Sequence, residues 1–204
     1  MTKITSQMVQ SLREKTSAGM MDCKKALVDA KGDMENALKL LREKGLASAA
    51  KRSGRTASKG VIESYIHMNG AIGVIVEVNC ETDFVAKTAE FKALAKDIAM
   101  HVAASNPQYV SREEVPAEII TKEKDIIKQQ LLHDEKNQKK PESIIDKIIE
   151  GRLEKFYSEV CLLDQPFIRD TDKTVVDLTK EAIAKIGENI VIRRFARFQL
   201  GSDS

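Results

Sequence analysis

Two β-rich runs joined by Asn69-Gly70 constrain the fold of this chain more than any other feature. The runs are Val61–Met68 and Ile72–Asn79. Asn-Gly between two such runs is a strong signal for a β-hairpin, because both residues tolerate the backbone angles of a tight turn. The chain is therefore expected to contain antiparallel β-structure.

The pairing register of this hairpin is open. A two-residue turn sets Ile66 across from Gly73, whereas a longer loop places Ile62 and Ile66 on the same face as the valines of the second run. These valines are Val74, Val76 and Val78. Because an odd slip exchanges the two faces of a strand, burial favours the longer loop, and we expect Ile62 and Ile66 to be buried.

The C-terminal run 190–200 alternates as a half-buried strand would, apart from Arg194. One face carries Ile190, Ile192, Ala196, Phe198 and Leu200, and the other carries Val191, Arg193, Phe195 and Arg197. The hairpin strands are its best partners. Helical patterns occupy 83–104, 115–133, 142–157 and 174–186, and "CLLDQPFIRD" is expected to be extended. The predicted fold class is α+β, with a small antiparallel sheet covered by helices on one side.

Residues 1–46 predict a separate module of three short helices. Thr5 or Ser6 can cap the first helix, Asp33 can cap the third, and Gly45 is expected to end it. Helices this short bury little surface, so the module is small and marginally stable by itself.

A basic linker is predicted between this module and the core. Residues 47–60, "ASAAKRSGRTASKG", mix small residues with Lys51, Arg52, Arg55 and Lys59. A solvated hinge is favoured over a segment that grips phosphates. The predicted organisation is a three-helix domain at 1–46, a linker at 47–60 and an α+β core at 61–204.

Composition describes a globular chain with balanced charge. Of 204 residues, 42% are hydrophobic and 31% charged, and 33 Lys and Arg stand against 31 Asp and Glu, for a net charge of +2. A dedicated nucleic-acid binder usually has a concentrated basic surface, so no direct nucleic-acid partner is expected. The N-terminus lacks the apolar core of a signal peptide, and no run is long enough to span a membrane. We expect a cytoplasmic protein without a membrane partner.

Residues that could carry catalysis or hold a metal are few. The cysteines are Cys23, Cys80 and Cys161, and the histidines are His67, His101 and His133. None of them has metal-ligand spacing, and no phosphate-binding glycine loop is present. We expect no metal site, no cofactor and no enzymatic activity. The remaining enzyme hypothesis is a nucleophile at Cys80, next to Glu81, although a buried strand cysteine is more common.

Two short stretches place apolar residues where local rules do not bury them. In "NCETDFVAK", Thr82 or Asp83 is a natural helix cap, and Phe84 either stays exposed or packs back onto the sheet. In "TSAGMMDCKK", Met20 and Met21 are adjacent, so at least one is expected to face solvent, against the alternative that both line a loose core.

Four long motifs stand out: "TSQMVQSLREKTSAGMMDCKKALVDAKGDMENALKLLREKG", "GVIVEVNCETDFVAK", "IIEGRLEKFYSEVCLLDQPF" and "IGENIVIRRFARF". Together they resemble the elongation factor Ts family, the guanine-nucleotide exchange factors of elongation factor Tu. The likeness covers most of the chain and is weakest between about residues 108 and 140. It implies an N-terminal domain similar to the ubiquitin-associated three-helix bundle.

The resemblance also implies two sets of site residues. Docking on the nucleotide-binding domain of elongation factor Tu would fall to Arg13, Met20, Met21 and Lys24. The element pushed beside the partner's magnesium site, which dislocates Mg²⁺ and promotes GDP release, would be Thr82, Asp83, Phe84 and Val85. Phe84 would then be a wedge that is exposed in the free protein and buried in the complex.

The chain departs from longer members of the family, which have two core subdomains and an inserted coiled-coil hairpin. A single core is expected here. Short members pair through their sheets, so a homodimer is plausible, with Phe195, Phe198 or Cys161 among its contacts. The alternative function is an RNA- or ribosome-binding accessory protein that uses Lys51, Arg52, Arg55, Arg193, Arg194 and Arg197.

Overall fold

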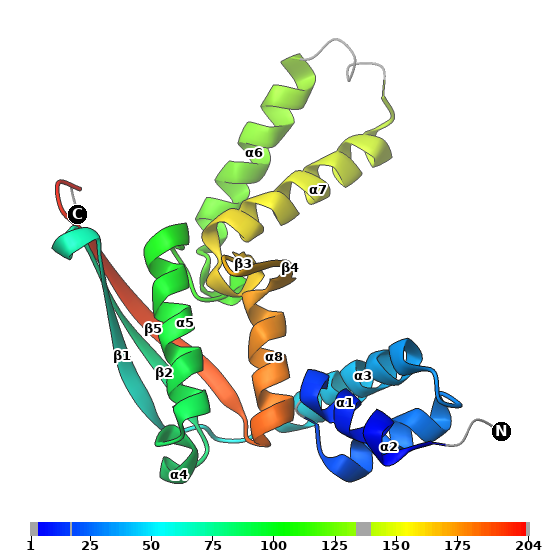
Figure 1. The fold of residues 1–204 in the computed structure, drawn as a ribbon. Helices are drawn as coiled ribbons and strands as arrows, with labels where there is room; N and C mark the ends of the chain where they lie inside the picture. Colours follow the sequence, from blue (N-terminus) through cyan, green and yellow to red (C-terminus); the bar gives the residue numbers. More distant parts are fainter. Residues whose placement is uncertain (1–3, 17, 134–139, 203–204) are drawn as a thin grey trace. The chain divides into compact units, whose positions relative to one another are not determined.

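The computed structural model describes residues 4–16, 18–133 and 140–202. Helices and small antiparallel sheets together form a mixed α+β fold, which confirms the predicted class (Figure 1). The chain divides into two compact units. Unit 1 takes residues 1–61, 78–94 and 177–191, and unit 2 takes 62–77, 95–176 and 192–204.

Three helices of unit 1 pack together near the N-terminus, as predicted. They are α1 (Ser6–Thr16), α2 (Met20–Asp29) and α3 (Met34–Arg52). Their shared core consists of Val9, Leu12, Cys23, Ala26, Leu27, Ala37 and Leu41. The Thr5 hydroxyl accepts from Met8 N at 3.2 Å, and the Asp33 carboxylate accepts from the backbone N–H of both Glu35 and Asn36. These are the predicted caps.

The predicted end of the third helix at Gly45 is wrong, because α3 continues to Arg52. Gly45 serves close packing instead: a Cβ at this position would lie 3.2 Å from the Cβ of Ala184 on α8 (Val175–Ile186). The alanines that follow are strong helix formers and outweigh a cost of about 1 kcal/mol for the glycine. The first part of the expected linker is therefore helical, while the domain boundaries at 46 and 61 stay a prediction.

The main sheet has the order β1-β2-β5. Its strands are β1 (Lys59–His67), β2 (Ile72–Cys80) and β5 (Ile190–Gln199). A 3-10 turn at Met68–Gly70 joins the hairpin, with positive φ at Met68, Asn69 and Gly70. Across this turn Ala71 N donates to Met68 O at 3.2 Å, the pairing that a two-residue turn sets, so the expected longer loop is wrong.

The predicted burial of β1 is wrong. Ile62 and Ile66 are 71% and 65% exposed, whereas the valines of β2 at 74, 76 and 78 are buried. A Cβ on Gly73 would lie 3.3 Å from Cδ1 of Ile66, so Ile66 shares the open face of the sheet with Gly73 and not the face of the valines. Successive side chains of a strand point to opposite faces of the sheet, so residues that alternate with the buried valines lie on the open face.

The alternation of β5 changes phase at Arg193 and Arg194, which are both exposed. Ile190 and Ile192 are buried, but beyond the change Phe195 and Arg197 are the half-buried residues, the reverse of the predicted assignment. Two consecutive outward residues are the pattern of a β-bulge. Within unit 2, Arg197 Nε donates to the carbonyl of Ala103 at 3.2 Å, so its side chain reaches the helix that covers the sheet.

The helix predicted at 83–104 is interrupted. It forms α4 (Asp83–Ala86) and α5 (Ala89–Ser105). The Thr88 hydroxyl donates to Val85 O at 2.8 Å and accepts from Phe91 N at 3.2 Å. Thr88 therefore closes the first helix and caps the second.

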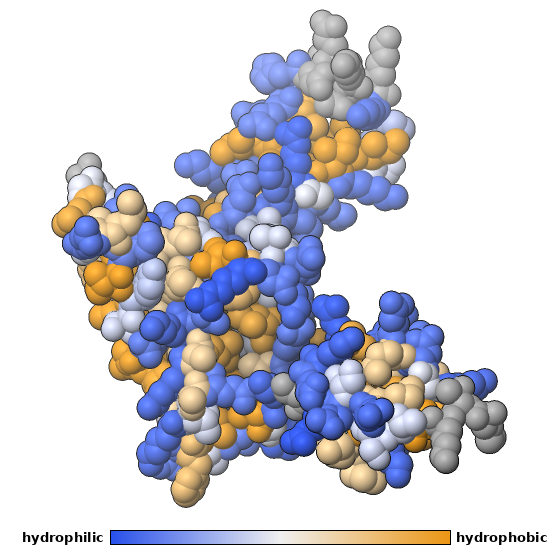
Figure 2. Space-filling model, in the orientation of Figure 1, coloured by the Kyte–Doolittle hydropathy of each residue, from blue (hydrophilic) through white to orange (hydrophobic). Residues whose placement is uncertain are grey.

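The remaining helices of unit 2 form a hairpin. It consists of α6 (Ala117–His133) and α7 (Glu142–Val160), which agree with the predicted ranges to within three residues at each end. Ile127, Leu131 and Ile145 form the core between them, and hydrophobic side chains gather there in Figure 2.

A second small sheet was not expected from the sequence. The segment predicted to be extended begins with a 3-10 turn at Leu162–Asp164, and β3 (Pro166–Phe167) then pairs antiparallel with β4 (Asp170–Thr174). A further 3-10 turn spans Arg112–Glu114.

Candidate functional site

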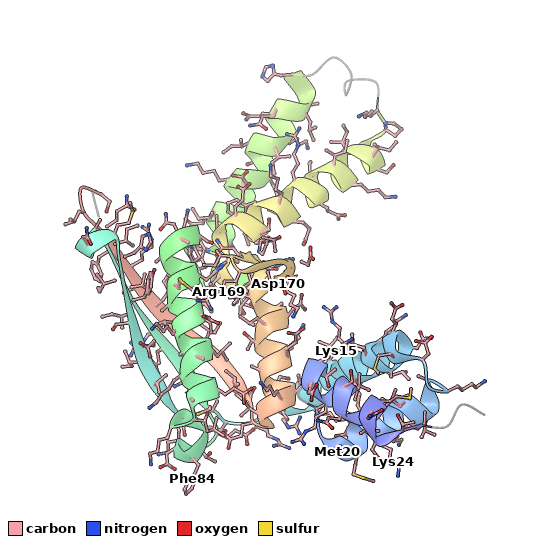
Figure 3. All side chains as sticks on the ribbon, in the orientation of Figure 1. Lys15, Met20, Lys24, Phe84, Arg169 and Asp170 are labelled. Atoms are coloured by element: carbon pink, nitrogen blue, oxygen red, sulfur yellow. The ribbon has the colours of Figure 1, made fainter. Side chains whose placement is uncertain are left out.

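An exposed phenyl ring stands at the start of α4. Phe84 is 78% exposed and its side chain points away from the protein (Figure 3). The alternative in which Phe84 packs back onto the sheet is therefore wrong. Thr82 is the helix cap, and its hydroxyl accepts from Val85 N at 3.4 Å. The four residues 82–85 form a single capped turn, called the tip below.

Asp83 carries a carboxylate beside this ring. Lys87, one turn later, donates to Asp83 Oδ2 at 2.7 Å, and its ammonium lies 6.0 Å from the centre of the Phe84 ring. The hydrogen bond from Lys87, followed by its positive charge, lowers the pKa of Asp83. Asp83 is therefore ionised at neutral pH and places a negative charge next to an apolar wedge.

The Cys80 thiol lies beneath the tip and does not suit a nucleophile. It is fully buried, and Sγ donates to Thr82 O at 3.1 Å. Burial, followed by the charge of Glu188, raises the pKa of the Cys80 thiol. Since the thiolate is the reactive form, this environment disfavours the enzyme hypothesis.

The tip is tied to a distant turn that sequence analysis missed. Glu188 and Asn189, between α8 and β5, bond to the backbone and side chains of Glu81 and Thr82. The partners are separated by 106 to 108 residues, so no periodicity or short motif could have paired them. All four residues belong to unit 1.

The predicted docking residues are all exposed on the first two helices. Met20 and Met21 are 48% and 74% exposed, so the alternative that both line a loose core is wrong. Arg13 lies in the last turn of α1, and Lys24 lies one turn after Met20 on α2, where Figure 3 shows both labelled side chains. Residues four apart share a helix face, so a methionine and a cation are neighbours there.

The other residues considered from sequence have structural surroundings. His101 is buried and hydrogen-bonded to Gln165, and His67 is bonded to Tyr65. Cys161 is fully buried, so it is no surface contact for a second copy, whereas Phe198 is 68% exposed.

Within the described ranges, no group of His, Cys, Asp and Glu is placed to hold a metal ion. In the same ranges, no helix combines the length and the apolar composition needed to cross a membrane.

Comparison with known proteins matches this chain to a family of translation factors. The family model described as Elongation factor TS matches residues 1–182. Elongation factor Ts of Carboxydothermus hydrogenoformans is 63% identical over 198 residues, which cover 97% of this chain and 89% of that protein. The homologue in Caldanaerobacter subterraneus subsp. tengcongensis is 61% identical, with 97% of each chain covered. Both the exposed tip and the three-helix module therefore lie in a chain that belongs to the elongation factor Ts family.

Proposed function

We propose that this chain is a guanine-nucleotide exchange factor, which binds GDP-bound elongation factor Tu, displaces Mg²⁺ and promotes GDP release during translation elongation in the cytoplasm. Membership of the elongation factor Ts family supports elongation factor Tu as the binding partner. The single observation that carries the proposal is the solvent-exposed ring of Phe84 on a capped turn. An isolated protein gains nothing from an ordered, exposed phenyl group, whereas a partner can bury it.

Thermodynamic linkage explains how burying this ring releases GDP. A factor that binds the nucleotide-free partner more tightly must weaken GDP binding by the same ratio. Burying a phenyl side chain contributes about 1.5–3 kcal/mol, which corresponds to roughly tenfold to hundredfold weaker GDP binding. The remainder of the effect would come from the wider interface.

The carboxylate of Asp83 supports a second contribution near the metal. An exposed aspartate is ionised at neutral pH, and the hydrogen bond from Lys87 lowers the pKa of Asp83 further. Loss of Mg²⁺ removes the positive charge that neutralises the nucleotide phosphates, so GDP is held less tightly. This chain makes and breaks no covalent bond in the process, and GTP then refills the empty site.

Docking would be supplied by the three-helix module. Arg13, Met20, Met21 and Lys24 combine exposed cations with unbranched, polarisable side chains that adapt to a partner surface. In this proposal the module sets affinity for the partner, and the tip sets the rate of release. The two contributions are separable by mutation.

The test follows a fluorescent GDP analogue leaving elongation factor Tu at fixed Mg²⁺. Phe84→Ala and Asp83→Ala should slow release at saturating factor, while Ile126→Ala, an exposed apolar residue of α6, should not. Failure of the folded wild-type protein to accelerate release would sink the proposal.

Binding of RNA is the weaker alternative, because several of its candidate cations already have protein partners. Arg55 pairs with Glu81 at 3.5 Å, Arg194 with Glu77 at 2.7 Å, and Arg197 donates to a backbone carbonyl. Phosphate binding would have to displace these acceptors. A steep dependence of RNA affinity on salt would favour the alternative.

A homodimer through the open face of the main sheet is also proposed. Exposed apolar residues along its strands and the segment that follows include Ile62, Ile66, Ile75, Phe198 and Leu200. Ile66 lies on the open face with Gly73, as described above. We expect Ile66→Lys to shift a dimer to monomer in analytical ultracentrifugation without loss of helix content. An unchanged mass would contradict this pairing.

A further inference from the structure

Glu188 holds the start of the tip with three hydrogen bonds. Its Oε2 accepts from Glu81 N at 3.1 Å and from Thr82 N at 3.0 Å, and its Oε1 accepts from the Thr82 hydroxyl at 2.6 Å. Both oxygens of the half-buried carboxylate are thus used on the two residues before α4. Charge-assisted hydrogen bonds of this kind are about twice as strong as neutral ones.

These bonds also decide how Thr82 caps the helix. A hydroxyl has one proton to donate, and that of Thr82 is directed at Glu188. The lone pairs of Oγ1 are therefore left to accept from Val85 N. Glu188 orients the cap, and the cap orients the single turn that carries Phe84.

A second set of hydrogen bonds joins the tip to the turn at Glu188 and Asn189, with the acceptor now on the side of the tip. Glu81 Oε1 accepts from Asn189 N at 2.7 Å, and Asn189 Nδ2 donates to Arg55 O at 2.7 Å and to Ser53 O at 3.3 Å. Gly187, with φ of 89°, ends α8 and turns the chain so that Glu188 and Asn189 reach the tip. The tip is consequently anchored to two other segments of unit 1 rather than to its own short helix.

We infer that Glu188 is a positioning residue for nucleotide exchange, which holds the tip in the orientation that presents Phe84 to the partner. This inference rests on the proposed function. A four-residue helix is too short to be stable alone, so its order must come from these anchors. Order present before binding removes an entropic cost that the complex would otherwise carry.

The experiment compares Glu188→Gln, Thr82→Val and the double variant with wild type in the GDP-release assay, over a range of factor concentrations. Glu150→Gln, an exposed glutamate of α7, is the matched control. Glu188→Gln should lower the maximal rate roughly tenfold, the value of one charge-assisted hydrogen bond, with less than about a threefold change in the half-saturating concentration. The maximal rate of the double variant should fall by less than the product of the two single losses, because both substitutions weaken the same cap.

Amide NMR gives a readout that does not depend on exchange. The Glu81 and Thr82 amide protons should shift upfield in Glu188→Gln and stay in place in Glu150→Gln, with equal melting temperatures. The positioning role would be overturned by a normal maximal rate in Glu188→Gln or by unchanged amide shifts of Glu81 and Thr82. It would also be overturned if the rate loss of the double variant equalled the product of the two single losses. A wild-type protein that does not accelerate release overturns the proposed function instead, and the amide shifts then still show whether Glu188 holds the tip.

Discussion

His101 Nε2 lies 2.9 Å from Gln165 Oε1 in the interior of unit 2, and Ile168 N donates to the other ring nitrogen at 3.3 Å. Because Nδ1 accepts this hydrogen bond, the ring is neutral and its proton is on Nε2. Nε2 therefore donates a hydrogen bond to Gln165 Oε1. Gln165 in turn donates to Glu159 O at 2.8 Å. One imidazole thus connects α5 with the end of α7 and with the turn after β3.

This arrangement predicts a stability that falls in mild acid. Burial lowers the pKa of His101, so the unfolded chain binds a proton more readily than the folded one. The free energy of unfolding should be complete above the unfolded pKa of about 6.5 and should fall below it, by up to about 1.4 kcal/mol per pH unit, until the folded pKa is passed. Urea titrations at pH 7.5 and 5.5 measure the loss. His101→Gln should abolish it, and the exposed His133→Gln should retain it.

Arg112 should contribute to the stability of unit 2. Its guanidinium bonds to both oxygens of Glu154 at 2.8 Å and to Asp164, and it stacks 4.8 Å from the centre of the Tyr157 ring. Lysine cannot reproduce this fork, so Arg112→Lys should lower the free energy of unfolding by roughly 1 kcal/mol for a side chain that is 40% exposed. Denaturation in urea measures the difference, and the loss should shrink in high salt.

Gly60 should not tolerate a side chain. It has φ of 147°, and a Cβ there would lie 2.1 Å from Val78 O across the hairpin. Gly60→Ala should cost about 3 kcal/mol or more, because the backbone must move. Gly54→Ala is the matched control, since open space surrounds its position. Equal melting temperatures for the two variants would contradict the close approach of β1 and β2.

Met21 should act on affinity and not on the rate of release. Met21→Ala should raise the Kd for elongation factor Tu roughly tenfold, as expected for losing most of a buried methionine side chain, and should leave the maximal release rate unchanged. Titration by calorimetry and the release assay separate the two quantities. Ile144→Ala, an exposed apolar residue of α7, should change neither. A lower maximal rate would contradict the division of roles between module and tip.

Features that depend on residues close together in the sequence could be predicted from the sequence. Caps at Thr5 and Asp33, the Asn69-Gly70 turn and the helix ends at Gly187 depend on residues within a few positions, and these predictions are confirmed. The prediction of one continuous helix over 83–104 was wrong at Thr88. The hydroxyl of Thr88 competes with the backbone for hydrogen bonds, and the spacing of apolar residues does not reveal this.

The errors elsewhere have non-local causes. Gly45 looked like a helix stop, but contact with Ala184 explains it. The face of β1 was assigned by assuming that every isoleucine is buried, whereas Ile62 and Ile66 lie on an uncovered side. Glu188 could not be found because its partners are distant in sequence.

The break at Thr88 gives the tip and α5 separate hydrogen-bond ladders. Since Thr88 already satisfies Phe91 N, α5 keeps its first turn when residues 83–86 open, and the buried Phe91 ring stays in place. Amides of α4 should therefore exchange with solvent deuterium through a small local opening, whereas those of α5 await a larger one. Opening of the tip therefore does not melt the helix behind it.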